Sequence, residues 1–284
     1  MNANLIFVKL GGSLITDKSI RESPRRAIIR QLAHEVHRAL RERPTLHVVL
    51  GHGSGSFGHW VADRYHTQDG VDNQEAWYGF AEVSAAASRL NRIVVDTFLE
   101  AEVPVLSLQP SSAVQAHDGR IRTFPLDNLK MALRHHLVPL IFGDVAFDDL
   151  KGGTILSTEA LFAYAAARLQ PGWILLLGNA PGVLDAQGRV VPAITPLTYA
   201  DARRYLSGSG GTDVTGGMAD KVDRMVKLTD KHPEIRARIL SGREPDTLFQ
   251  ALMDPNTASG TLIHAQDPPS VPNQPDGNEP SCYA

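Results

Sequence analysis

The sequence predicts an α/β fold: a three-layer αβα sandwich with a mainly parallel central sheet. Short apolar runs, each as long as a buried strand, alternate along the chain with longer segments whose apolar residues recur at helical spacing. Several of these runs end directly in glycine-rich segments, where open α/β sheets bind ligands. With 284 residues, 43% of them hydrophobic and 21% charged, the chain can bury a substantial core.

The first half of the chain opens with an apolar strand, residues 5–10. An amphipathic helix over 24–43 follows, and it begins with proline, which suits a first helical turn. The next strand, 45–50, leads straight into a glycine-rich loop. The remaining elements expected here are a helix over 73–102, a strand over 103–109, a helix over 125–137 and a strand over 138–145.

The second half continues the alternation. A hairpin turning at Gly188 is expected within 183–191. The other expected elements are a helix over 157–169, a strand over 173–179, helices over 196–206 and 218–232, a strand over 237–240, a helix over 244–253 and a strand over 260–265. We expect residues 1–265 to form one domain and the proline-rich, polar tail 266–284 to be disordered.

Composition excludes several classes of protein. A net charge of −3 supplies no positive field, so neither nucleic acid nor an anionic membrane is an expected partner. Cys282 is the only cysteine, which excludes a disulfide framework and a thiolate zinc site within one chain. The N-terminal segment lacks a basic leader and the apolar runs are too short to span a bilayer, so we expect a cytoplasmic protein.

Glycine clusters indicate a phosphate-binding protein. Three follow strands directly: "KLGGS" (9–13), "GHGSGSFGH" (51–59) and "GNAPG" (178–182). A fourth, "GSGGTDVTGGMADK" (208–221), opens a helix. Glycine lets backbone N–H groups converge on an anion, and a following helix adds the positive end of its dipole.

The familiar phosphate-binding motifs do not fit. Gly53, Gly55 and Gly58 satisfy G-x-G-x-x-G, but a dinucleotide fold needs this loop after the first strand and an acidic residue ending the next one. Here the loop follows the second strand, and the next strand ends in Gln109. The chain also lacks the Gly-Lys-Ser/Thr of a P-loop and the "HRD" and "DFG" of protein kinases.

Three lysines accompany the glycine loops: Lys9 ends the first strand, Lys18 follows it, and Lys221 comes just after "TGGM". A single lysine is usually a solvated surface residue. Lysine at the end of a buried strand, however, calls for an anionic partner. Asp144 could be that partner, or it could cap a turn.

His59 closes the second glycine loop. An isolated histidine there would cap the following helix or pack beside Trp60. Next to a glycine-rich loop it can instead donate a hydrogen bond to a bound phosphate, which a carboxylate would repel. His52, His135 and His136 lack this context, and we expect them to be structural or solvated.

The segments "VKLGGSLITDK", "GHGSGSFGH", "FGDV" and "TDVTGGMADKV" resemble, in this order, those of the amino-acid kinase superfamily over roughly residues 5–265. "GSFGH" followed by "DVTGGM" is most similar to the isopentenyl phosphate kinases, with the fosfomycin kinases as near relatives. The resemblance implies an amino-acid kinase fold, ATP with Mg²⁺ as the phosphoryl donor, isopentenyl phosphate as the acceptor, and a homodimer. It also implies an acceptor-binding lobe up to about residue 170 and a nucleotide-binding lobe from about 171 to 265.

The same resemblance assigns roles to individual residues. The catalytic set is Lys9, Lys18, His59, Asp144 and Lys221, with Lys18 stabilising transition-state charge and Asp144 positioning the lysines. No clustered carboxylates in the sequence suggest a metal site held by the protein itself. The nucleotide-binding set is Lys9, Gly11, Gly12, Ser13, Gly55, Asn179, Gly217 and Lys221, and the acceptor-binding set is Ser54, Gly55, His59 and Thr158.

Three departures from the superfamily pattern leave alternatives open. "GNAPGV" (178–183) lacks the usual acidic residues, "STE" (157–159) replaces a usual S-G-D, and Asp220 stands where a small residue is common. The first departure leaves open whether ATP or GTP is the donor, and it is also the support for a further alternative, a non-catalytic nucleotide-binding regulator. The site motifs do not separate isopentenyl phosphate from fosfomycin or another small phosphonate or alkyl phosphate as the acceptor. The helix carrying Trp77, Phe80 and Val83 is expected to line the acceptor pocket beyond His59, or else to face the core.

Overall fold

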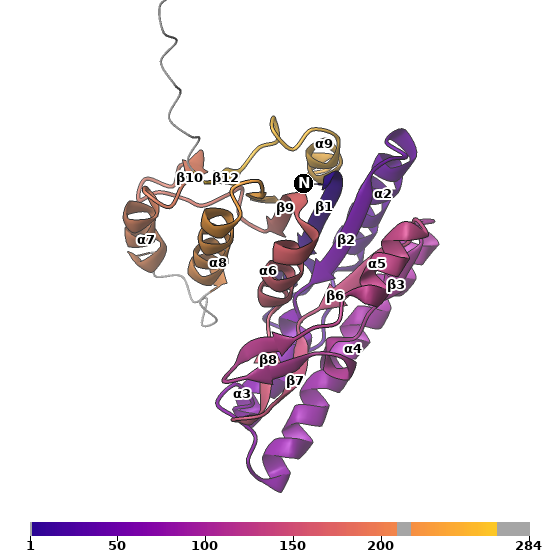
Figure 1. Ribbon diagram of the computed structural model, residues 1–284, viewed down its shortest axis with the longest axis vertical. Helices are drawn as coiled ribbons and strands as arrows, with labels where there is room; N and C mark the ends of the chain where they lie inside the picture. Colours follow the sequence, from indigo (N-terminus) through magenta and orange to yellow (C-terminus); the bar gives the residue numbers. More distant parts are fainter. Residues whose placement is uncertain (1, 209–216, 266–284) are drawn as a thin grey trace, which may run out of the picture.

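The protein is described from a computed structural model, which covers residues 2–208 and 217–265. Its centre is an eight-stranded sheet in the order β10-β12-β11-β9-β1-β2-β6-β3 (Figure 1). Among these neighbours, only β11 and β12 pair antiparallel, which confirms the mainly parallel sheet. The strands are β1 (Asn2–Leu10), β2 (His47–His52), β3 (Val105–Ser107), β6 (Val138–Phe142), β9 (Pro171–Gly178), β10 (Ala193–Ile194), β11 (Arg236–Ser241) and β12 (Thr261–Ile263).

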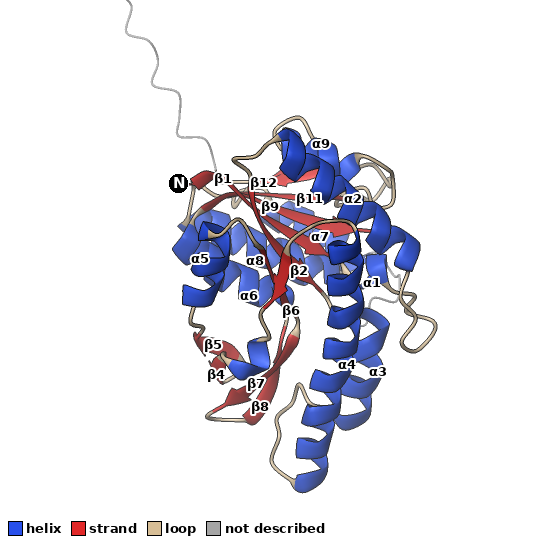
Figure 2. Ribbon diagram, turned by 90° about the vertical axis from the view of Figure 1, so that its right-hand side faces the viewer, coloured by secondary structure: helices blue, strands red, loops and turns tan. Residues whose placement is uncertain are grey.

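Helices cover both faces of this sheet (Figure 2). Side chains alternate along each strand, so that in β1 Ile6 and Val8 enter one core while Phe7 enters the other. The first core is closed by α2 (Arg26–Glu42), α4 (Gln74–Glu100) and α9 (Thr247–Met253). The second is closed by α5 (Asp127–Arg134), α6 (Thr158–Leu169), α7 (Tyr199–Gly208) and α8 (Gly217–Lys231). The predicted three-layer αβα sandwich is therefore confirmed.

A second, four-stranded sheet ordered β5-β4-β7-β8 extends one end of the molecule, and the sequence did not predict it. The strand expected over 138–145 is divided at Gly143. Residues before it belong to β6 of the large sheet, and residues after it belong to β7 of the small sheet. A one-turn helix, η1 (Pro110–Ser112), precedes this sheet. The strands of the small sheet are β4 (Gln115–His117), β5 (Arg120–Thr123), β7 (Asp144–Asp148) and β8 (Gly152–Leu156).

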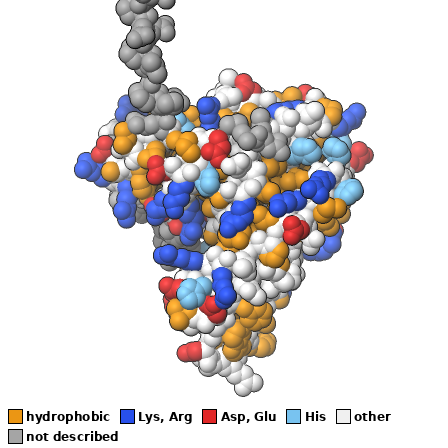
Figure 3. All heavy atoms as spheres, viewed as in Figure 1, with side chains coloured by type: hydrophobic (Ala, Val, Ile, Leu, Met, Phe, Trp, Pro, Cys, Tyr) orange, Lys and Arg blue, Asp and Glu red, His pale blue; other side chains and the backbone are white. Residues whose placement is uncertain are grey.

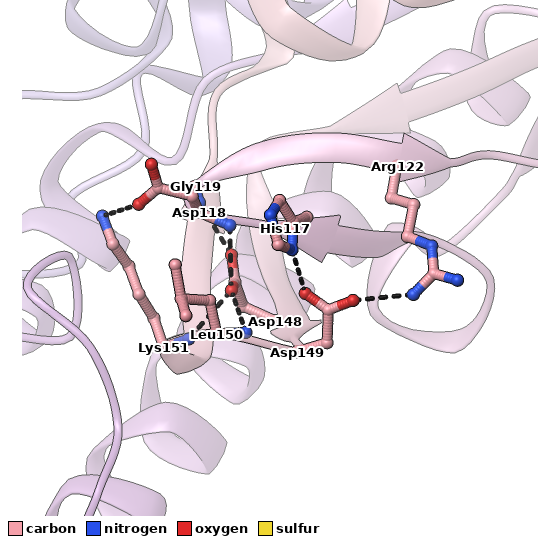
Figure 4. Close-up of polar contacts among 8 residues, drawn as sticks. All are labelled: His117, Asp118, Gly119, Arg122, Asp148, Asp149, Leu150 and Lys151. Atoms are coloured by element: carbon pink, nitrogen blue, oxygen red, sulfur yellow. Dashed lines mark hydrogen bonds and ion pairs between the residues drawn. The ribbon is translucent and has the colours of Figure 1, made fainter.

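The buried Asp148 carboxylate ties the two hairpin turns of this small sheet together (Figure 4). It accepts backbone hydrogen bonds from Asp118 and Gly119 in one turn and from Leu150 and Lys151 in the other, over 2.7–3.1 Å. Burial opposes its ionisation, but these four donors hold the pKa of Asp148 below its ordinary value. The small sheet is thereby fixed as a rigid extension beside β6.

Two further differences from the sequence expectations concern the glycine segments. Most of the loop 51–59 and the residues after it form α3 (Gly55–Tyr65), and Gly12–Ile15 forms the short helix α1, where only loops were expected.

The predicted hairpin is present as a bridge between Leu184 and Val190, with Gly188 at a φ of +77°. The expected disordered tail and residues 209–216 of the fourth glycine segment lie outside the described residues. Within the described residues, no helix combines the length and apolarity needed to cross a membrane.

Candidate active site

Two glycine loops meet backbone to backbone where β1 and β2 end. β1 leads into α1 and β2 into α3, and the two strands pair in parallel, so both loops emerge at the same edge of the sheet. A Cβ atom added to Gly12 would lie 2.6 Å from the backbone nitrogen of Gly55. One added to Gly55, whose φ is +51°, would lie 2.1 Å from Thr16 Oγ1. Only glycine permits this approach at either position.

Thr16 fastens the two loops to each other. Its Oγ1 donates to the Gly12 carbonyl (2.7 Å) and accepts from the Ser56 N–H (2.9 Å), and the side chain is fully buried. Among the described residues, no acceptor is recorded for the backbone N–H groups of Gly12, Ser54 or Gly55. The joined loops therefore present N–H donors at one place, as a phosphate-binding nest does.

A cavity of about 180 Å³ lies against these loops. It gathers cations and an imidazole from elements far apart in the sequence. Its lining residues are Lys9, Gly12, Ser13, Lys18, Gly53, Ser54, Gly55, His59, Gln68, Gly143, Ile155, Leu156, Ser157, Thr158, Glu159, Gly217, Asp220 and Lys221.

A second cavity, of about 160 Å³, adjoins the first on the β9 side. Lys9, Ser13 and Lys221 line both cavities, so two ammonium groups stand where the cavities meet. Asn179 lines the second cavity and donates from Nδ2 to the Ser13 carbonyl (2.9 Å), which ties the β9 loop to the first glycine loop. The other lining residues are Leu176, Leu177, Gly178, Ala180, Met218 and Ile239.

The anionic partner of Lys9 is Glu159. Both side chains are buried, and the ammonium donates a short hydrogen bond to Glu159 Oε1. Burial opposes ionisation of this carboxyl, but the ammonium groups of Lys9 and Lys221 hold its pKa below the ordinary value. Glu159 thus acts on both lysines that stand between the cavities.

Of the two roles that the sequence leaves open for Asp144, the structure shows the turn cap and not the partnership with Lys9. Asp144 is also buried, but its carboxylate accepts from the backbone N–H groups of Ser111 (3.2 Å) and Val145 (2.8 Å). It therefore fastens η1 to the start of β7. In the sequence, Asp144 follows the apolar strand β6 and Glu159 follows the glycine-containing strand β8. The packing of α6 beside β1 is what brings Glu159 to the Lys9 ammonium.

Most of the predicted site residues lie together. Gly11 is an exception, because it donates its N–H to the Leu177 carbonyl (2.9 Å) and packs on β9. Thr158 lines the first cavity, but its hydroxyl donates to the His52 carbonyl (2.6 Å). The predicted residues that line the first cavity are Lys9, Gly12, Ser13, Lys18, Ser54, Gly55, His59, Thr158, Gly217 and Lys221.

Sequence reasoning missed Glu159, Gln68 and Ile155. The departure "STE" was the available signal for Glu159, since it places a carboxylate in the first turn of a helix beside the site. Of the two alternatives for the helix α4, the structure supports packing against the core and not lining the cavity. Phe80 and Val83 are buried in the core, and Ile155 and Leu156 of β8 line the cavity instead.

Trp77 lies outside the cavity, at the surface. It is 37% exposed and packs on Phe80 (5.3 Å between ring centres) and on Phe147 (5.9 Å). Figure 3 shows hydrophobic side chains gathered at this narrow end of the molecule, over the small sheet and α4.

Comparison with known proteins gives one consistent match. Residues 4–241 match the model of the "Amino acid kinase family". The isopentenyl phosphate kinase of Methanocaldococcus jannaschii is 34% identical over 257 residues, covering 88% of this chain and 95% of that protein. The isopentenyl phosphate kinase of Haloferax volcanii is 36% identical over 252 residues, covering 87% of this chain and 99% of that protein. A crystal structure of an isopentenyl phosphate kinase superposes with a TM-score of 0.78 at 27% identity, covering 91% of this chain and 99% of that one.

Proposed function

The chain belongs to the amino acid kinase family, and we propose that it transfers the terminal phosphoryl group of ATP to isopentenyl phosphate, forming isopentenyl diphosphate. The observation that carries this proposal is the sharing of Lys9 and Lys221 by two adjoining cavities, one of which also contains His59. Two phosphate-bearing substrates placed end to end in these cavities would meet at the two ammonium groups.

The first cavity suits a phosphate monoester. Such a group has a second pKa near 6, so it is largely a dianion at neutral pH and its oxygen needs no general base. It needs donors that hold it, and these are the N–H groups of Ser54 and Gly55 with the His59 imidazole. Ile155 and Leu156 supply apolar surface for a short alkyl tail on the same cavity.

The second cavity suits the nucleotide. Leu177, Met218 and Ile239 offer apolar surface for a base, while the first glycine loop and Asn179 lie on its polar side. Lys9, Gly12, Ser13 and Lys221 would hold the donor phosphates between the base and the acceptor.

The reaction concentrates negative charge on the phosphoryl group in transit, and fixed cations stabilise that charge most effectively. Lys9 and Lys221 stand where the cavities meet, and Lys18 lines the acceptor side. Glu159 holds Lys9 in place through a buried ion pair. We assign Glu159, rather than Asp144, as the carboxylate that positions the lysines.

Magnesium would enter with ATP, whose phosphate oxygens are suitable ligands for it. The carboxylates that line the cavity are both paired with cations, Glu159 with Lys9 and Asp220 with Arg224. They therefore fit a metal held by the nucleotide better than one held by a protein cage. When bound, Mg²⁺ would neutralise charge on the donor phosphates.

Three further features of the proposal follow from the family. We propose a homodimeric, cytoplasmic enzyme, with an acceptor-binding lobe up to about residue 170 and a nucleotide-binding lobe from about 171 to 265. Size-exclusion chromatography with light scattering measures the oligomeric state directly. A monomer at micromolar concentration would contradict the dimer but would leave the proposed reaction intact.

An acceptor screen tests the function. Purified protein with MgATP is offered isopentenyl phosphate, dimethylallyl phosphate, geranyl phosphate or fosfomycin, and ADP release is followed in a coupled assay. We expect the highest kcat/KM with isopentenyl phosphate. Turnover only with fosfomycin would reassign the acceptor, whereas tight ATP binding without turnover on any acceptor would favour a regulatory protein.

A further inference from the structure

A buried chain of hydrogen bonds connects β3 with the second glycine loop. Ser107 Oγ donates to Asn91 Oδ1 (2.7 Å), Asn91 Nδ2 lies 3.2 Å from His52 Nε2, and His52 Nδ1 lies 3.1 Å from the Gly53 carbonyl oxygen. His52 is fully buried and Asn91 is 7% exposed. The central part of this hydrogen-bond network is therefore shielded from bulk water.

The His52 ring is fixed in its orientation. It stacks on Phe142 with ring centres 5.4 Å apart and an angle of 4° between the planes. Its backbone carbonyl accepts from Thr158 Oγ1 (2.6 Å) and from the Gly143 N–H (3.2 Å). The ring thus lies between Phe142 and the glycine loop, held by the stacking and by its contacts with Asn91 and Gly53.

Only one arrangement of protons satisfies this chain with a neutral ring. The Gly53 carbonyl can only accept, so His52 Nδ1 must carry the proton. Nε2 then becomes an acceptor, which requires the Asn91 amide to present its NH₂ group. Ser107 donating to Asn91 Oδ1 is consistent with that orientation of the amide.

The contact at Gly53 determines the direction of the next donor. In a planar trans peptide the carbonyl of one residue and the N–H of the next point to opposite sides. The Gly53 carbonyl points toward the buried ring, so the Ser54 N–H points away from it. Gly53, Ser54 and Gly55 all line the first cavity.

We propose that Asn91 and His52 are positioning residues: Asn91 holds His52 in its Nδ1-protonated form, and the ring holds the Gly53 carbonyl so that the Ser54 N–H faces the acceptor phosphate. The proposal rests on the function proposed above for the identity of that phosphate. Its structural part, the proton arrangement of the ring, is independent of any substrate.

The electrostatic surroundings favour the neutral ring. Burial lowers the pKa of His52 to about 4, and the Lys9 ammonium adds to this effect. The ring therefore remains neutral near pH 7, and one tautomer is sufficient to describe it.

Nitrogen NMR of the ligand-free protein tests the structural part. We expect His52 Nδ1 protonated and Nε2 unprotonated at neutral pH. A ring protonated at Nε2 would overturn the proposal even in a protein that phosphorylates isopentenyl phosphate. Conversely, the expected tautomer in a protein without turnover would refute only the proposed function.

The isosteric variant Asn91→Asp tests the positioning. Its carboxylate can only accept, so a neutral ring must move its proton to Nε2 and lose the Gly53 contact. We expect kcat/KM for the acceptor to fall about tenfold near pH 8.5, mainly through KM, while KM for ATP stays within about twofold. The introduced carboxylate raises the pKa of the adjacent ring above its wild-type value. A second proton on the ring would restore the contact, so the deficit relative to wild type should shrink as the pH falls toward about 6.5.

Two controls separate positioning from general loss of stability. Thr97→Val removes a buried hydrogen bond of the same helix, from Thr97 Oγ1 to the Ile93 carbonyl (2.8 Å), without touching the loop. It should leave acceptor KM and the pH profile unchanged. If Asn91→Asp behaves like Thr97→Val at equal loss of Tm, the proposal fails. If Asn91→Asp does not fold, Ser107→Ala replaces it, with an expected two- to threefold rise in acceptor KM and an unchanged KM as the contradicting result.

Discussion

The Lys9 ammonium and the Glu159 carboxylate form an ion pair inside the protein, although the two residues are 150 positions apart in the chain. One ends a central strand and the other lies in the first turn of α6. A buried charge is costly unless it is paired, so each residue depends on the other. This pair sets the position of a cation at the junction of the two cavities.

Glu159→Gln should impair catalysis and stability together. The variant keeps a hydrogen-bond acceptor but leaves the Lys9 ammonium buried without a negative partner, which costs on the order of 3–5 kcal/mol in comparable pairs. We expect kcat to fall by about tenfold to a hundredfold. Glu159→Asp is the matched control, because it retains the charge, and should lose less than about fivefold. A Gln variant with wild-type kcat would contradict the assigned role.

His59→Ala should weaken use of the acceptor more than use of ATP. His59 lines the first cavity but not the second, so its loss removes a donor to the acceptor phosphate alone. We expect KM for isopentenyl phosphate to rise about tenfold or more, with KM for ATP within about twofold. His135→Ala, an exposed histidine at the end of α5, should change neither. Equal losses for both substrates would argue against a clamp on the acceptor.

Much of the site could be predicted because a parallel sheet brings its strand ends together. Lys9, His59 and Lys221 come from three separate elements, yet each follows a strand or a glycine segment of recognisable type. Phosphate binding uses few residue types, and glycine loops, lysine and histidine are among them. The sequence pattern is therefore sufficient to predict that these three residues line one cavity, as they do.

The parts that could not be predicted depend on packing. The sequence motifs indicate only Asp144 as a candidate partner of Lys9, whereas the packing of α6 brings Glu159 to the ammonium. No motif predicts that His52, in the second glycine segment, contacts Asn91 of α4, because that contact depends on how the helix packs. The small sheet was missed partly because two of its strands, β4 and β5, have only three and four residues and show little periodicity.

Gly55→Ala and Gly188→Ala form a matched pair that separates close packing from backbone strain. Both glycines have positive φ, +51° and +77°. A Cβ on Gly55 would meet Thr16 Oγ1 at 2.1 Å and the Gly12 carbonyl at 2.7 Å, whereas one on Gly188 would meet nothing within 4 Å. Gly188→Ala should therefore cost about 1–2 kcal/mol of unfolding free energy with activity retained.

Gly55→Ala should cost clearly more than Gly188→Ala, because overpacking adds roughly 1–3 kcal/mol to the same backbone strain. It should also displace the two glycine loops and reduce kcat/KM for the acceptor and ATP together. Urea denaturation and steady-state kinetics on both variants measure these effects. Equal destabilisation, with normal kinetics for both, would show that the loop contact can relax.

The unfolding free energy should fall on mild acidification because of His52. Burial lowers the pKa of this ring from 6.5 to about 4, so in this interval the unfolded chain binds a proton that the folded protein does not. The contribution of His52 to the unfolding free energy is thus fully present above about pH 6.5. It is lost as the pH falls toward 4, and the total loss is about 3 kcal/mol. His52→Asn has no titrating ring, and urea denaturation from about pH 7 to 4.5 should show a shallower loss for it than for wild type. Parallel losses in the two proteins would place the proton uptake at other groups and would imply that the ring is charged, or accessible to water, in the folded state.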